Sequence, residues 1–116
     1  MNDSIKEILS EIMNTHEDNA PESDTYPYCV FETRLIARDD SISRYVLEIN
    51  IWDKRDTYNR AETYSKKIDA VLDHAICDYG SGKWRTYISD KRHVQDEDKS
   101  LKRIKMEYEL IAVEGE

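Results

Sequence analysis

The chain has 116 residues, of which 39% are apolar and 36% are charged, and its formal net charge is −8. A chain of this length predicts a single domain, residues 1–116, and its negative charge disfavours a nucleic-acid partner because phosphate backbones repel it. No apolar run approaches the roughly 20 residues that span a bilayer, and the N-terminus lacks the basic and apolar regions of a signal peptide. We therefore expect no membrane partner and a cytoplasmic location.

The first predicted element is a helix from Ser4 to Asn14. Apolar residues recur there at helical spacing, and Ser4 with Glu7 has the pattern of a capping box. The next stretch, residues 17–25, is acidic and polar and is interrupted by Pro21. This composition predicts an exposed or mobile acidic loop.

Two strands are predicted after this loop. From Tyr28 to Ala37, apolar and polar residues alternate, and Asp39 to Ser41 supplies turn-forming residues. From Arg44 to Trp52 the odd positions form a continuous apolar face, which is typical of a half-buried strand.

A second helix of about 20 residues is predicted from Asn59, because apolar residues recur at intervals of three or four as far as Tyr79. Asn59 and Glu62 suit its start, and Gly80 suits the left-handed position that follows a helix end. His74 lies inside this pattern, where we expect a partly exposed surface histidine.

The rest of the chain predicts two strands joined by a hairpin tip at residues 95–100. The predicted fold is α+β in the order α-β-β-α-β-β, with one mostly antiparallel four-stranded sheet and both helices on one face. The residues expected to form the core between the sheet and the second helix are Leu47, Ile49, Ile68, Leu72, Met106 and Tyr108.

The opposite face of this sheet would be left uncovered, and apolar residues among its charges suit contact with another subunit. Basic residues of the last hairpin would meet acidic groups of that subunit, and two apolar residues would form the centre of the contact. The candidate interface residues are Trp52, Arg85, Lys91, Arg92, Lys102, Arg103, Lys105 and Ile111.

The sequence offers no catalytic, cofactor-binding or metal-binding motif. The three histidines have no second imidazole or cysteine at ligand spacing, and the 96–98 acidic run lacks the calcium-loop pattern. Cys29 and Cys77 are expected to be reduced structural thiols. A small hydrolase or nuclease would need clustered acids, and turn or strand-end roles account for Asp39, Asp40 and Asp53. We therefore expect no enzyme activity.

Four strings resemble the small tail-completion, or tail-terminator, proteins of long-tailed phages and prophages. They are YPYCVFE, YVLEINIWDK, RAETYSKKIDAVL and DEDKSLKRIKMEYEL, and the resemblance spans roughly residues 26–113. The acidic segment 17–24 has no counterpart in that family.

The resemblance implies a structural protein that forms a ring, typically a hexamer, at the head-proximal end of the tail tube. Its partners would be copies of itself, the tail tube protein and a head-closure or connector protein, and DNA would be only a passing cargo. It would be found in the bacterial host cytoplasm during assembly and then in the virion tail. The alternatives are another neck or head-tail connector component and a small regulatory protein-binding module.

Overall fold

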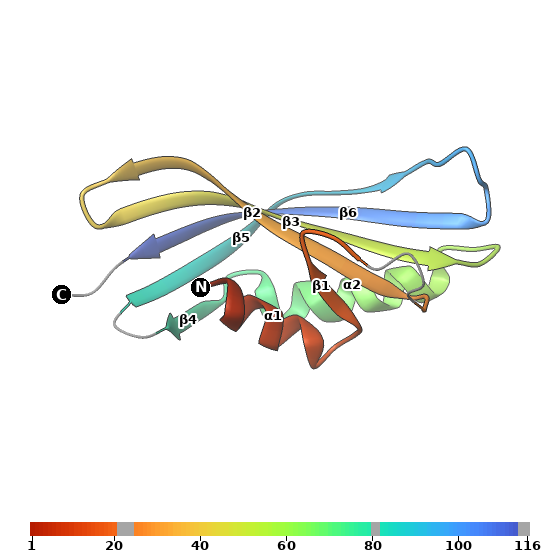
Figure 1. Ribbon diagram of the computed structural model, residues 1–116, viewed down its shortest axis with the longest axis horizontal. Coiled ribbons are helices and arrows are strands. Elements are labelled where there is room, and N and C mark those ends of the chain that lie inside the picture. Colours follow the sequence, from red (N-terminus) through yellow and green to blue (C-terminus); the bar gives the residue numbers. More distant parts are fainter. Residues whose placement is uncertain (21–24, 80–81, 114–116) are drawn as a thin grey trace.

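The computed structural model describes residues 1–20, 25–79 and 82–113. These residues form an α+β domain of two helices and six strands, and Figure 1 shows their arrangement. In chain order the elements are α1 (Asn2–Ser10), β1 (Thr15–Glu17), β2 (Tyr28–Asp39), β3 (Ile42–Lys54), α2 (Asn59–Leu72), β4 (Ile76–Tyr79), β5 (Gly82–Val94) and β6 (Leu101–Val113).

The predicted four-stranded sheet is wrong, because the six strands form one mixed sheet in the order β1-β2-β3-β6-β5-β4. β1 runs parallel to β2, and the other neighbouring strands are antiparallel. The two strands that the sequence did not reveal are the edge strands. β1 has three residues and β4 has four, which is too few for a period of two to be recognised.

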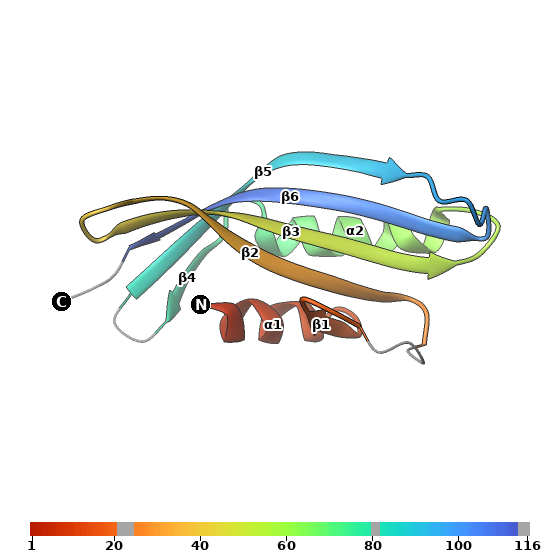
Figure 2. The same ribbon diagram turned by 45° about the horizontal axis from the view of Figure 1, so that its top comes forward.

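The sheet is strongly twisted and curls into a half-barrel, with both helices beneath it (Figures 1 and 2). The β2-β3 and β5-β6 hairpins extend beyond the helices at opposite ends of the molecule (Figure 1). The molecule is correspondingly elongated, with extents of 49 × 24 × 22 Å.

The core lies between the sheet and the helices. All six residues predicted to form it are fully buried, namely Leu47, Ile49, Ile68, Leu72, Met106 and Tyr108. They are joined by residues of α1 and by aromatic side chains of β2 and β5, including Ile5, Leu9, Phe31 and Trp84. The expected alternation of β3 and β6 is therefore confirmed along both central strands.

α1 starts earlier than predicted and ends at Ser10, so the capping role expected of Ser4 is wrong. The N-cap position is Met1, and the Ser4 hydroxyl donates to the Met1 carbonyl at 2.7 Å. Ser4 Oγ also accepts the indole N–H of Trp84 at 2.9 Å. Ser4, which was expected to cap the helix, instead connects α1 to β5 through this hydrogen bond.

α2 has 14 residues, which is shorter than predicted. The helix ends at Leu72 because hydrogen bonds from β5 hold the chain that follows. Thr86 donates its hydroxyl to the Leu72 carbonyl and its N–H to the Ala75 carbonyl. Ile88 donates its N–H to Asp73 Oδ1. His74, which has a φ of 61°, follows the helix end rather than lying within the helix, and its side chain is exposed. Gly80 lies outside the described residues.

A β-bulge in β5 determines which of its side chains face the helices. The register with β6 shifts between Ile88 and Asp90. Trp84 and Thr86 face the core before the bulge, whereas Lys91 and His93 point to the helix side after it. A strict period of two therefore misplaces Lys91.

Candidate docking face

The face of the sheet that points away from both helices is the open face (Figure 2). β3 places Arg44, Glu48, Asn50 and Trp52 there, because the intervening residues Leu47, Ile49 and Ile51 are buried on the helix side. β6 contributes the residues that lie opposite them, namely Arg103, Lys105, Glu107, Glu109 and Ile111. Because inward and outward side chains alternate along both central strands, their outward residues form one continuous surface of polar and apolar groups.

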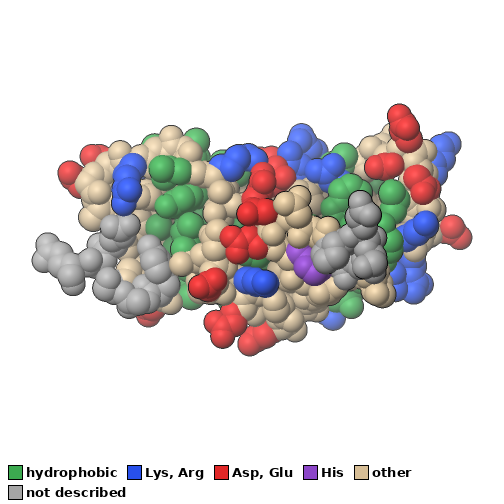
Figure 3. All heavy atoms as spheres, viewed as in Figure 1, with side chains coloured by type: hydrophobic (Ala, Val, Ile, Leu, Met, Phe, Trp, Pro, Cys, Tyr) green, Lys and Arg blue, Asp and Glu red, His purple; other side chains and the backbone are tan. Residues whose placement is uncertain are grey.

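A band of charged residues crosses the centre of the open face. Glu48 and Glu107 lie directly opposite each other on β3 and β6, a pairing of like charges that is destabilising by itself. Lys105 Nζ lies 3.2 Å from Glu48 Oε1 and 3.2 Å from Glu107 Oε1, so one ammonium group bridges both carboxylates. Arg34 Nη1 is 3.6 Å from Glu48 and 2.8 Å from Glu32. On the side shown in Figure 3, acidic side chains form a band across the middle, with hydrophobic side chains to both sides of it.

These contacts keep Glu48 ionised. Partial burial by itself would raise the pKa of Glu48, but hydrogen bonds from Asn50 and Lys105 and the charges of Lys105 and Arg34 outweigh it, so the pKa is lowered. Glu48 therefore holds Lys105 in place across the neutral pH range.

Two related groups of residues flank this band. On one side Arg103 lies over the Trp52 ring, 5.0 Å from its centroid, and donates to Asn50 Oδ1 at 2.9 Å. On the other side Arg44 lies opposite Ile111 and donates to Glu109 Oε1 at 2.9 Å.

The antiparallel pairing of β3 and β6 relates these two groups by a pseudo-two-fold axis. The axis passes between Glu48 and Glu107, each of which is the middle residue of its 13-residue strand. Arg44 then corresponds to Arg103, Asn50 to Glu109 and Trp52 to Ile111. The open face therefore presents an arginine beside a large apolar side chain at two separate places.

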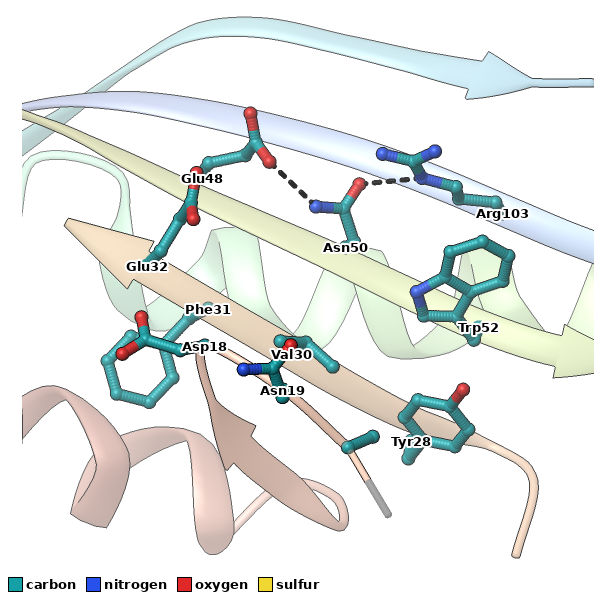
Figure 4. Close-up of a pocket in the computed structure, with 11 residues that line it drawn as sticks. Asp18, Asn19, Tyr28, Val30, Phe31, Glu32, Glu48, Asn50, Trp52 and Arg103 are labelled. Atoms are coloured by element: carbon teal, nitrogen blue, oxygen red, sulfur yellow. Dashed lines mark hydrogen bonds between the residues drawn. The ribbon is translucent and has the colours of Figure 1, made fainter. Parts of the chain in front are cut away.

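The Trp52 side of the open face is hollowed into a pocket of about 310 Å³. Figure 4 shows Trp52 and Arg103 on one side of the pocket, with Tyr28 and Val30 of β2 beside them and Asp18 and Asn19 at its rim. The pocket combines aromatic and aliphatic walls with polar groups, a composition that suits a side chain from a protein partner.

Six of the eight predicted interface residues lie on the open face. They are Trp52, Arg85, Arg92, Arg103, Lys105 and Ile111. Lys91 and Lys102 do not: Lys91 Nζ binds Glu62 Oε2 of α2 at 3.0 Å, and Lys102 Nζ lies 5.7 Å from the ring centroid of Tyr58, just before α2. The bulge turns Lys91 toward the helix, and Lys102 shares the inward phase of Ile104.

Arg44, Tyr28 and Ile76 also lie on this face but are not among the predicted interface residues. Arg44 and Tyr28 could have been found, since each is in phase with other outward residues of its own strand. Ile76 could not have been found, because it fell inside the longer helix that was expected.

Among the described residues, no three His, Cys, Asp or Glu side chains come together in a way that could hold a metal ion. In the same residues, no helix is long and apolar enough to cross a membrane. Cys29 is buried, which raises the pKa of its thiol to about 11 despite a hydrogen bond with Thr15.

Comparison with known proteins gives a structural likeness and no sequence family. No protein-family model and no curated protein matches the chain. A chain in the solved structure of the virion of a native gene transfer agent particle is similar, with a TM-score of 0.73 and 15% sequence identity. The match covers 92% of this chain and 84% of that chain, so the two share their fold over nearly the whole domain.

Proposed function

We propose that this chain is a structural subunit of a phage-like particle. The observation that carries the proposal is the shared fold with a chain of the gene transfer agent virion, over 92% of the present chain. The phage tail-protein resemblance of its sequence points in the same direction. The role needs no chemistry, and we expect none.

Within such a particle, we assign the chain to the head-proximal end of the tail tube as a tail terminator. Copies of it would form a ring, most simply a hexamer, that stops tube growth and then meets a head-closure or connector protein. The open face supports a role in docking, because it presents arginines next to large apolar side chains, the kind of residues that dominate protein interfaces. A net charge of −8 suits a ring through which DNA slides without being held.

The proposal is tested by deleting the gene in a particle-producing bacterium and examining the products by electron microscopy. Loss of a terminator should give tails of uncontrolled length that carry no heads, and the chain supplied from a plasmid should restore complete particles. Peptide mass spectrometry of purified particles should find the chain at the tail. Normal particles from the deletion strain would refute a virion role.

The same experiment separates the other candidates. Tails of normal length without heads would assign the chain to another neck or connector position. Complete particles that lack the chain, with altered expression of particle genes, would favour the regulatory protein-binding module.

A further inference from the structure

A row of side chains crosses the open face from the edge strand β4 to β3, away from the pocket. The strand registers place Ile76 opposite Arg85, Arg85 opposite Ile111, and Ile111 opposite Arg44. Ile76, at 63% exposure, is the most exposed large apolar side chain among the described residues. We call these four residues, Ile76, Arg85, Ile111 and Arg44, the arginine row.

The cations of this row are not fully neutralised within the molecule. Arg44 has one exposed partner, Glu109, and no carboxylate of the described residues pairs with Arg85. Because an exposed ion pair contributes little, both arginines are available to acidic groups outside the molecule. The two lie on β3 and β5, separated by β6, which puts them about 10 Å apart.

The side of the molecule that carries α1 has a row of acidic side chains, which we call the acidic stripe. Asp3, Glu7 and Glu11 recur at intervals of four along α1 and its C-cap, all exposed, and line a shallow hollow together with Lys6 and Ser10. Four residues of helix rise about 6 Å, so these carboxylates span about 12 Å. The half-buried Ile12 lies next to Glu11 and adds an apolar neighbour.

We propose that the acidic stripe of one copy docks on the arginine row of a second copy. Opposite charges face each other at similar spacing, and Ile12 together with the methylene groups of the acidic side chains covers Ile111 and Ile76. α1 lies beneath the sheet and the row lies on its open face, so the contact cannot form within one molecule (Figures 1 and 2). Such a contact is heterologous, and its repetition closes a ring when the rotation divides a full turn.

This inference rests on the proposed ring for its choice of partner, and it is tested on the purified protein by sedimentation over a range of concentrations. R44E/R85E and, separately, E7R/E11R should each weaken self-association by about tenfold or more. The variant that combines all four changes should recover it, because the charges are exchanged. K66E/K67E makes the same charge change as R44E/R85E on the exposed surface of α2 and should associate like the wild type.

An independent experiment pairs the two surfaces covalently. In a C77S background, which leaves only the buried Cys29 as a native thiol, E7C/R85C should form disulfide-linked chains of several subunits on oxidation, whereas E7C or R85C alone should stop at dimers. Wild-type protein that remains monomeric up to about 1 mM, or arginine-row variants that associate normally, would overturn the inference. Either result would leave the particle experiment unaffected, so the two proposals can fail separately.

Discussion

Hydrogen bonds between single side chains connect α2 to the sheet. The buried Asp53 of β3 accepts from Arg60 Nε at 2.9 Å, and the Tyr108 hydroxyl donates to Asp69 Oδ1 at 2.7 Å. Burial by itself would raise the pKa of Asp53, but the hydrogen bonds from Arg60 and the Lys54 backbone and the Arg60 charge outweigh it, so the pKa is lowered. Burial and the neighbouring Asp69 carboxylate raise the pKa of Tyr108 far above its usual range. These polar contacts fix the orientation of a helix whose apolar stripe alone would allow rotation.

Leu72, the last residue of α2, is the clearest single test of the core. Its side chain is fully buried, and the adjoining backbone is held by Thr86. Leu72→Ala should lower the free energy of unfolding by about 2 to 5 kcal/mol, because it removes buried methyl groups and leaves a cavity. Urea denaturation followed by circular dichroism measures this change.

Its neighbour provides the control. Val71 is 47% exposed, so Val71→Ala should change stability by no more than about 0.5 kcal/mol. Equal losses for the two variants would show that the packing phase of α2 is wrong.

At the scale of elements, long regular strands were predictable and short edge strands were not. β3 and β6 follow a strict alternation because each has one face in the core, so periodicity predicts both of them and their inward residues. The expected hairpin tip at residues 95–100 also falls between strands in the structure, whereas the expected turn at residues 39–41 is shorter, because Asp39 is the last residue of β2. α2 was overextended because Ala75 and Tyr79 continue its apolar spacing, and contacts with the distant β5 end the helix.

The candidate site was predictable where a strand keeps a regular alternation of inward and outward side chains. Trp52, Arg103 and Ile111 were placed correctly on the outward face, since their strands are regular. Lys91 was misplaced because the bulge that turns it inward has no local sequence signature. The pairing that brings Arg44 next to Ile111 joins residues far apart in the chain, and periodicity within one segment contains no information about it.

A cluster of charged side chains connects the start of α2 to β5, and its contribution to stability should fall at low pH. Glu62 accepts from Lys91 Nζ at 3.0 Å and lies 2.6 Å from His93 Nε2, and His93 stacks on Tyr58 with ring centroids 3.7 Å apart. Partial burial would raise the pKa of Glu62, but the hydrogen bonds and charges of His93 and Lys91 outweigh it and lower the pKa below its ordinary value of 4.5.

A carboxylate with a lowered pKa in the folded state stabilises the fold above its ordinary pKa, and this stabilisation is lost as the pH falls through the folded-state value. Wild type should therefore exceed Glu62→Gln in stability at about pH 6, and the difference should shrink toward about pH 3. Chemical denaturation at a series of pH values gives the two curves. Glu7→Gln, which removes a charge from the exposed face of α1, is the control. A difference that stays constant with pH would exclude the ionised Glu62 as its source.

At the scale of the whole molecule, the two halves of the chain share one core and one sheet. α1, β2 and β3 come from the first half and α2, β5 and β6 from the second, and the halves meet along the full length of β3 and β6. Ser4 of α1 contacts Trp84 of β5 across the same core. Neither half can bury its apolar face without the other.

We therefore predict that residues 1–116 unfold in one cooperative transition, as expected for a single domain. Far-ultraviolet circular dichroism reports on both helices, and tryptophan fluorescence reports on the buried Trp84 together with the more exposed Trp52. The two signals should give coincident denaturation curves, and the W52F variant should leave only the Trp84 signal for comparison. Separate midpoints for the two signals would show that the halves are independent units.

The open face connects this fold to assembly, and the last prediction concerns its Trp52 side. Arg92 and Arg103 lie on this face, and Arg103 covers the ring of Trp52 at the pocket. None of the three residues belongs to the buried core, so W52A/R92E/R103E should fold as the wild type does while losing its docking surface. In a particle-producing strain that lacks the gene, the variant should fail to restore tails that join heads, because charge reversal places carboxylates where the partner's acidic groups would dock. Circular dichroism of the purified variant verifies that it is folded, and K66E serves as the complementing control. Tails of normal length that join heads in the presence of the triple variant would mean that this side of the open face makes no essential contact.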